Sequence, residues 1–166
     1  MGRNGKWGRL RFSVIGRAWA SGGDLPTAKN NAGVFGTQSA TMNAGGYTPA
    51  SPAITNTCQT YDGSSWTEVA DLNESRYRLS GAGADNESFM VFSGDSPPGS
   101  ATAKTELWNG TSWTETNDLN TAKYLLSGSG TSTAAMLVAG MKEEPLGPPS
   151  GWFQSTLHEQ WDGSSW

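Results

Sequence analysis

The chain has 166 residues, enough for one ordinary domain, and it is rich in glycine (22), proline (8) and tryptophan (8). Its 11 basic and 15 acidic residues give a net charge of −4, which argues against a nucleic-acid partner because such a surface needs a clustered basic face. Cys58 is the only cysteine, so an intrachain disulfide and a cysteine metal cluster are excluded, and no apolar run approaches the ~18 residues of a membrane span.

A five-residue tag that ends in tryptophan recurs along the chain. It reads Asp-Gly-Ser-Ser-Trp at 62–66 and 162–166 and Asn-Gly-Thr-Ser-Trp at 109–113, and a decayed form ends at Trp19. Trp66 and Trp113 lie 47 residues apart, and Trp113 and Trp166 lie 53 apart. Self-similarity at a period near fifty residues is typical of a repeat architecture.

The tags divide the chain into consecutive units. A basic segment, residues 1–9, comes first, and residues 10–22 are expected to form the last two strands of a preceding unit. Three units follow at 24–70, 71–117 and 118–166, and the third lacks most of its fourth strand.

The middle unit predicts four antiparallel strands joined by turns. Small residues favour a first strand, a continuous apolar run favours a second strand covered on both faces, and an alternating segment and an outer strand flank an Asn-Gly turn. The four predicted strands are 77–84, 89–92, 104–108 and 113–116, and the Pro-Pro-Gly stretch within 95–101 is expected to be a loop.

This pattern resembles the kelch repeat of β-propellers. The residues that carry the resemblance are the glycines that end the second strands (Gly46, Gly94, Gly140), the aromatics of the third strands (Tyr61, Trp108, Trp161) and the cations before the first strands (Lys29, Arg76, Lys123). The resemblance implies an all-β fold of about three propeller blades plus flanking strands over residues 10–166. The chain departs from the motif in keeping a double glycine only at Gly45-Gly46 and in a short aromatic-to-tryptophan spacing.

The stretch from Trp108 to Lys123 also resembles degenerate kelch-like repeats in structural proteins of marine bacteriophages. That likeness implies a virion component.

The repeated tryptophans are expected to fill the space between neighbouring sheets. Trp19, Trp66, Trp113 and Trp166 occupy the same place in successive units, which indicates an architectural role. The alternative is that they stack on a sugar ring.

Three blades cannot close a ring when propellers typically have ~4–8. Either the chain is part of a longer protein, or a second copy of it completes a six-bladed ring. The stop at Trp166, inside a motif, favours the first alternative.

A ligand is expected on the connections between second and third strands, because they are proline-rich and differ in length on a repeated scaffold. The candidate ligand-binding residues are Tyr47, Asp95, Lys142, Glu143, Glu144, Trp152 and Phe153. An aromatic plane beside carboxylates suits a sugar. The alternative is that Trp152 and Phe153 start the third strand and pack inside.

The repeated cations Lys29, Arg76 and Lys123 are expected on the same end of the molecule, where they could line a central mouth and bind an acidic group. The alternative is that they bond loop carbonyls or the nearby carboxylates of Asp24, Asp71 and Asp118.

The sequence contains few of the residues that form common catalytic sites. His158 is the only histidine, so neither a Ser/His/Asp triad nor a histidine metal site is predicted, and we expect no cofactor and no enzyme activity. The prediction is a structural or interaction protein of a phage tail or capsid surface, with other virion proteins and a host-surface glycan as partners. The alternatives are a secreted or cell-surface binding module and a fragment of a glycosidase-type propeller enzyme.

Overall fold

The computed structural model describes residues 22–50, 53–143 and 152–166, and these residues form an all-β fold. The all-β prediction is therefore confirmed. Three large sheets and three two-stranded sheets occur in the described residues; all pairing is antiparallel and no sheet closes on itself.

Each large sheet follows the order of its strands along the chain. The first contains β1 (Gly33–Thr37), β2 (Ala40–Ala44), β5 (Cys58–Tyr61) and β6 (Trp66–Val69). The second contains β7 (Ser80–Asp85), β8 (Ser88–Phe92), β11 (Thr105–Trp108) and β12 (Trp113–Thr116). The third contains β13 (Ser127–Thr131), β14 (Ala134–Val138) and β17 (His158–Trp161).

A small hairpin is inserted between the second and third strands of every large sheet. The hairpins are β3 (Tyr47–Thr48) with β4 (Ala53–Ile54), β9 (Asp95–Ser96) with β10 (Ser100–Ala101), and β15 (Met141–Glu143) with β16 (Trp152–Gln154). The prediction of an open loop at 95–101 is wrong, because the proline-rich stretch occupies only the hairpin turn. The alternative that Trp152 and Phe153 start the third strand is also wrong, since both pair with β15 and that strand begins at His158.

A repeated glycine redirects the chain from each second strand into its hairpin. Gly46, Gly94 and Gly140 have φ values of 108°, 108° and 101°, which residues with a side chain rarely adopt. A Cβ on Gly94 would lie 2.9 Å from the Tyr77 carbonyl oxygen. These positions therefore need glycine for both conformation and space.

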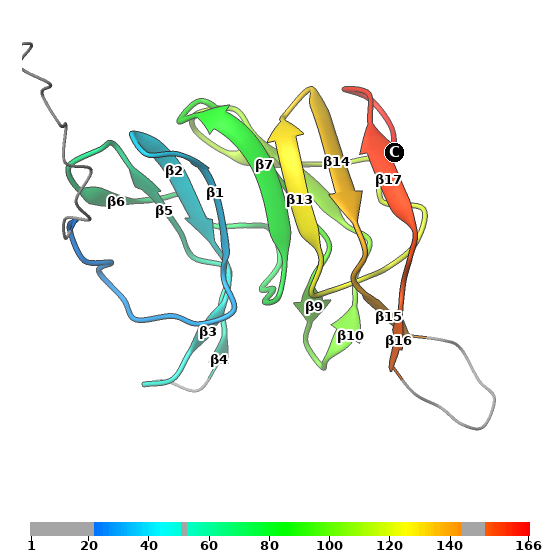
Figure 1. Cartoon of the computed structure of the whole chain (residues 1–166). Helices are drawn as coiled ribbons and strands as arrows, with labels where there is room; N and C mark the ends of the chain where they lie inside the picture. Colours follow the sequence, from blue (N-terminus) through cyan, green and yellow to red (C-terminus); the bar gives the residue numbers. More distant parts are fainter. Residues whose placement is uncertain (1–21, 51–52, 144–151) are drawn as a thin grey trace, which may run out of the picture.

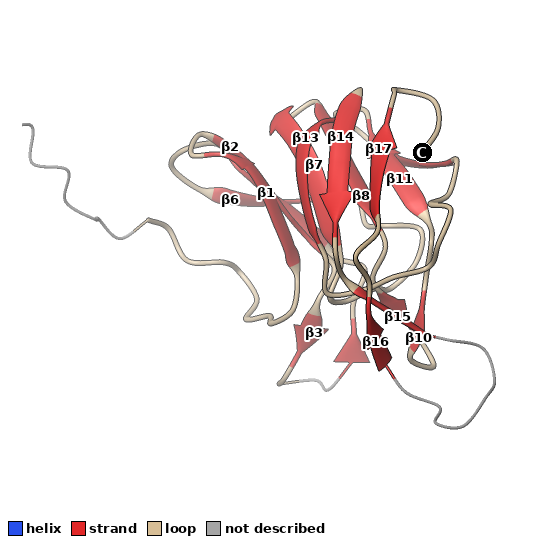
Figure 2. Cartoon of the chain, turned by 45° about the vertical axis from the view of Figure 1, so that its right-hand side comes forward, coloured by secondary structure: helices blue, strands red, loops and turns tan. Residues whose placement is uncertain are grey.

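The three large sheets stand side by side. Their first strands, β1, β7 and β13, run next to one another (Figure 1), and the three small hairpins project from one end of the array in both views (Figures 1 and 2). The short turns of the large sheets lie at the opposite end. Residues on the hairpins are thereby gathered at one end of the molecule.

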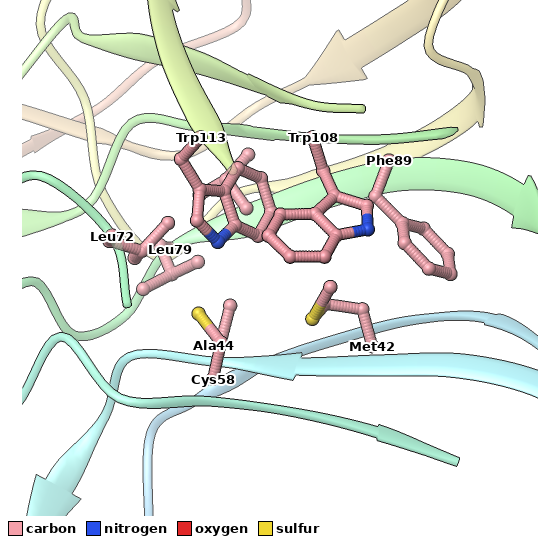
Figure 3. Close-up of a cluster of buried hydrophobic side chains, with 9 residues drawn as sticks. Met42, Ala44, Cys58, Leu72, Leu79, Phe89, Trp108 and Trp113 are labelled. Carbon is pink, nitrogen blue, oxygen red and sulfur yellow. The ribbon is translucent and has the colours of Figure 1, made fainter. Parts of the chain in front are cut away.

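Two apolar clusters fill the spaces between the sheets. Figure 3 shows Trp108 and Trp113 of the second sheet above Met42, Ala44 and Cys58 of the first. The second cluster joins the second and third sheets, and the Trp166 ring packs there against Phe92 at 5.0 Å between ring centroids. Trp113 and Trp166 thus lie between sheets, as predicted. Trp66 belongs to neither cluster, and its indole N–H donates to the Gly23 carbonyl at 3.1 Å. Trp19 is outside the described residues.

The intact form of the tag closes the turn between the third and fourth strands. Trp108 and Trp113 are the last register pair, so the loop runs from 109 to 112. The side-chain oxygen of Asn109 accepts the backbone N–H groups of Thr111 (3.0 Å) and Ser112 (2.9 Å). Asp62 makes the same two bonds in its own loop, because Asn and Asp both place an acceptor oxygen at this position.

Candidate functional site

The end of the array that carries the hairpins holds most of the predicted site residues. Tyr47, Asp95 and Met141 each follow a repeated glycine, and each forms a bridge to the segment that enters the first strand of its sheet. The hairpins are therefore fixed to the scaffold at their base.

The repeated cations lie inside this end. The side chains of Arg76 and Lys123 are 0% exposed. The prediction that they line an open mouth is therefore wrong, because each cation is folded back over its own sheet and reaches a carboxylate on the third strand. The alternative is correct in part, because Arg76 and Lys29 both donate to loop carbonyls. The carboxylate partners differ from those predicted: Arg76 pairs with Glu106 instead of Asp71. Lys123 pairs with Glu159 instead of Asp118.

Arg76 forms a buried ion pair with Glu106 of β11. Its Nη1 also donates to the carbonyl oxygens of Lys104 (2.8 Å) and Ser93 (3.3 Å). The other carboxylate oxygen of Glu106 accepts the backbone N–H of Asn73 at 2.9 Å. Every one of these contacts ties the segment between two sheets to the interior of the second sheet.

The third sheet repeats this arrangement. Lys123 Nζ donates to Glu159 Oε1 at 2.7 Å, and the backbone N–H of Asn120 donates to Glu159 Oε2 at 2.7 Å. Burial alone would raise the pKa of Glu159, but the hydrogen bonds from Lys123 and Asn120 hold that pKa below its ordinary value. Glu159 therefore stays ionised in the folded protein at neutral pH.

The first sheet has the same contact, with a neutral side chain in place of the carboxylate. Lys29 Nζ donates to the Gln59 side-chain oxygen at 2.9 Å and to the Thr57 carbonyl at 2.8 Å. Partial burial lowers the pKa of Lys29, and the more distant acidic groups offset this lowering only in part. Lys29 thus ties the segment before the first sheet to the third strand of that sheet.

Asp95 is another predicted site residue whose side chain is buried and paired within the protein. It is 2% exposed and its Oδ2 pairs with Arg78 Nη1 at 3.2 Å. The prediction that Asp95 contacts a ligand directly is therefore wrong, and the exposed partner of the pair is Arg78.

Arg78 combines a cation with aromatic neighbours. Its guanidinium lies 4.7 Å from the centre of the Tyr77 ring and 5.7 Å from that of Tyr124. It also borders a hollow of about 300 Å³ whose lining residues are Asn31, Ala32, Arg78, Leu79, Leu125 and Leu126. This arrangement can bind an anionic or polar group, since the guanidinium is partly exposed.

Sequence reasoning missed Arg78 and the buried carboxylates. Glu106 and Glu159 stand two residues before the third-strand aromatics, as Gln59 does, so alternation along those strands could have indicated that all three point inward. Arg78 carried no such signal, because Asn31 and Leu125 occupy its place in the other units.

The remaining predicted ligand residues lie on the third hairpin. Lys142 is opposite Phe153 and Glu143 is opposite Trp152 in the β15–β16 register. Glu144 lies outside the described residues. The hairpin thus brings Lys142, Glu143, Trp152 and Phe153 together along its backbone. None of these four residues lines the hollow beside Arg78.

The described residues contain few reactive groups. Burial raises the pKa of the Cys58 thiol to about 12, so the thiol remains protonated and unreactive at neutral pH. His158 is exposed while the adjacent Glu159 is buried and paired with Lys123, so these two do not act together. In the described part of the chain, no three His, Cys, Asp or Glu side chains gather to hold a metal ion. No helix found there could span a membrane.

Comparison with protein-family models and with curated proteins gives no match for this chain.

Proposed function

We propose that the chain forms blades of a kelch-like β-propeller that acts as a non-enzymatic attachment component of a bacteriophage virion. The observation that carries the proposal is the set of three unequal hairpins at one end of a repeated scaffold. Their bases are fixed by bridges to the scaffold, while their tips differ in length and composition. Such a division suits binding, because the scaffold positions loops that are free to vary.

The propeller assignment is supported by the strand order and packing. Successive antiparallel sheets place their first strands side by side, and aromatic side chains of the later strands pack between the first and second sheets. The radial arrangement of a propeller has these two properties.

The ligand class we propose is a host-surface glycan with an acidic group. Arg78 offers a partly exposed guanidinium beside the Tyr77 ring, and Tyr47 lies partly exposed on the first hairpin. An aromatic plane packs on the apolar face of a sugar, and a guanidinium binds a carboxylate in a bidentate manner.

A glycan array probed with the labelled chain tests this ligand class. We expect binding to sugars that carry a carboxylate, and at least about a tenfold loss of affinity in Arg78→Ala. Lys104→Ala is the matched control, because Lys104 pairs with Glu74 and Glu115 away from the hollow. Binding that Arg78→Ala leaves unchanged would remove Arg78 from the site, and binding to no glycan would overturn the proposed ligand class.

The virion assignment is supported by the likeness of the 108–123 stretch to phage structural repeats. Its test is mass spectrometry of purified phage particles from the source of this sequence. Peptides of the chain should copurify with the particles. Their presence only in the particle-free fraction would favour a secreted binding module.

A further inference from the structure

The second strands of the three large sheets present equivalent side chains toward the next sheet. Met42 and Met90 are 0% exposed, because each is covered by the sheet that follows it. The equivalent Met136 of β14 is 41% exposed, and its neighbour Val138 is 43% exposed. We call this side of each sheet, the side that faces the next sheet along the chain, its trailing face, and the opposite side its leading face.

Backbone hydrogen bonds connect successive sheets in a repeated pattern. The N–H of Gly46 donates to the carbonyl of Arg76 at 2.7 Å, and the N–H of Gly94 donates to the carbonyl of Lys123 at 3.0 Å. In both cases the glycine that follows a second strand donates its backbone N–H to the backbone carbonyl of the cationic residue in the next unit. The third glycine in this series is Gly140.

A second contact repeats with the same spacing. The N–H of Leu72 donates to the Asn56 carbonyl at 3.0 Å, and the N–H of Leu119 donates to the Ala103 carbonyl at 2.9 Å. The acceptor that follows in this series is the carbonyl of Thr156, which precedes the last strand of the third sheet.

A third contact repeats around the hollow. The N–H of Arg78 donates to the Asn31 carbonyl at 2.7 Å, and the N–H of Leu125 donates to the Arg78 carbonyl at 3.0 Å. All three residues have positive φ, between 52° and 55°, so the backbone repeats its conformation as well as its bonds. The next acceptor is the Leu125 carbonyl.

The first unit carries the complementary groups. By the same spacing, the partners required by the third sheet are the Lys29 carbonyl for Gly140, the Leu25 N–H for Thr156 and the Asn31 N–H for Leu125. All of them lie in the segment that enters the first sheet.

Side-chain size is complementary in the same register. A Cβ placed on Gly128 would collide with the Phe92 ring, so the second and third sheets join through a large residue against glycine. At the equivalent positions the trailing face of the third sheet has the smaller Val138, and the leading face of the first sheet has the larger Val34, which is 63% exposed. In a contact between these two faces, Val34 would take up part of the volume that Phe92 fills between the second and third sheets.

We propose that the trailing face of the third sheet binds the leading face of the first sheet of a second copy of this chain. The interface is head-to-tail and repeats the two sheet–sheet contacts within one copy. With three sheets in each copy, two such interfaces give a ring of six sheets, within the ~4–8 usual for rings of this kind. The inference depends on the sheet contacts alone and not on the ligand proposed above.

The first test is the solution mass of the 166-residue chain by light scattering after size exclusion. We expect a species of twice 17.5 kDa. Val138→Glu should raise the dissociation constant at least about tenfold, because the contact would bury an unpaired carboxylate. Thr114→Glu is the control, since Thr114 is exposed on the edge strand β12 and should leave the mass unchanged.

A mixing experiment distinguishes head-to-tail contact from other association. Val34→Lys alone and Val138→Glu alone should each be monomeric, with circular dichroism used to verify that both remain folded. Mixed together, the two variants should form a heterodimer, because one interface is unaltered and the other places the introduced ammonium against the introduced carboxylate. No other arrangement of the two faces gives this rescue.

The remaining outcomes also decide between the alternatives. A larger assembly that Val138→Glu abolishes still supports the contact and shows that the ring closes at more than two copies. A wild-type chain that stays at 17.5 kDa at the highest concentration overturns the proposal. Association that Val138→Glu does not change also overturns it. Glycan binding is measured separately, so its failure leaves this result intact.

Discussion

Two buried side chains of opposite charge stabilise each other inside the second sheet. Arg76 and Glu106 are both shielded from water, and they pair with each other inside the second sheet. Removing one member of such a pair leaves an uncompensated buried charge, which is more costly than the loss of one hydrogen bond.

Glu106→Ala should therefore lower the free energy of unfolding by about 3–5 kcal/mol. Chemical denaturation monitored by tryptophan fluorescence measures this change. Glu115→Ala is the control and should cost within about 1 kcal/mol, because Glu115 pairs with Lys104 at the surface. A cost for Glu106→Ala as small as that of the control would show that Arg76 finds another partner.

Relief of backbone strain at a single residue should raise the free energy of unfolding. Ala139 has a φ of 60° at the position that glycine occupies as Gly45 in the first sheet. A residue with a Cβ is disfavoured in this region by roughly 1–2 kcal/mol. Ala139→Gly should raise the free energy of unfolding by about 1 kcal/mol in a urea melt, whereas Gly140→Ala should lower it. A loss of stability in Ala139→Gly would contradict the strain.

The turn carboxylates predict how stability responds to acid. Hydrogen bonds from the backbone N–H of Ser65 and from the hydroxyl and N–H of Ser64 lower the pKa of Asp62 to about 2, and Asp162 behaves likewise. Because the folded pKa lies below the unfolded value, this stabilisation is present above about pH 4 and is lost as the pH falls towards 2.

Asp62→Asn with Asp162→Asn should therefore weaken the loss of stability between about pH 4 and pH 2. Asn109 shows that asparagine makes the same two backbone bonds, so the variant should be at least as stable as the wild type at low pH. Urea melts at about pH 7, 4 and 2.5 measure the difference. An identical acid dependence in both proteins would assign it to other groups, such as Glu159.

At the level of elements, the sheets are joined by side chains rather than by long loops. Trp113 begins the outer strand β12, is buried against the first sheet, and donates its indole N–H to the Ala70 carbonyl at 3.0 Å. One side chain therefore secures both the packing of two sheets and the segment that connects them.

Trp113→Ala should lower the free energy of unfolding by about 3–5 kcal/mol, because it leaves a cavity between two sheets. Trp113→Phe should cost less, since it keeps most of the apolar volume and loses the bond to Ala70. Calorimetry measures both. Near-neutral behaviour of Trp113→Ala would mean that the sheets do not depend on this contact.

At the level of the whole molecule, the middle sheet is covered on both faces and the third sheet on one. Val91 of β8 and Leu137 of β14 are both buried. On the trailing face of the third sheet, however, Met136 and Val138 are exposed in a single copy. Local opening should therefore be easier in the third sheet.

Hydrogen exchange of the Val138→Glu variant should show slower exchange in β8 than in β14. In the wild-type chain at high concentration this difference should narrow, because a second copy covers β14. Equal protection of both strands in the variant would show that the three sheets open as one cooperative unit.

The sequence by itself determined the all-β class and the position of most strands in the large sheets. Repeated tags, the apolar run at 89–92 and the alternating third strands are local signals, and strand formation at these places depends on local pattern. Phe89 to Phe92 are all buried, as a strand covered on both faces requires.

Only the tertiary structure decided what the charged residues and connections do. Arg76 and Glu106 are 30 residues apart with no local signal that joins them, because the contact exists only after the strands pair. The small hairpins also could not be predicted, because their strands are too short for a periodic pattern. Nor could the burial of Asp95, because it depends on the ion pair with Arg78. Local structure follows from neighbours in the sequence, whereas burial and pairing follow from which distant strands the fold brings together.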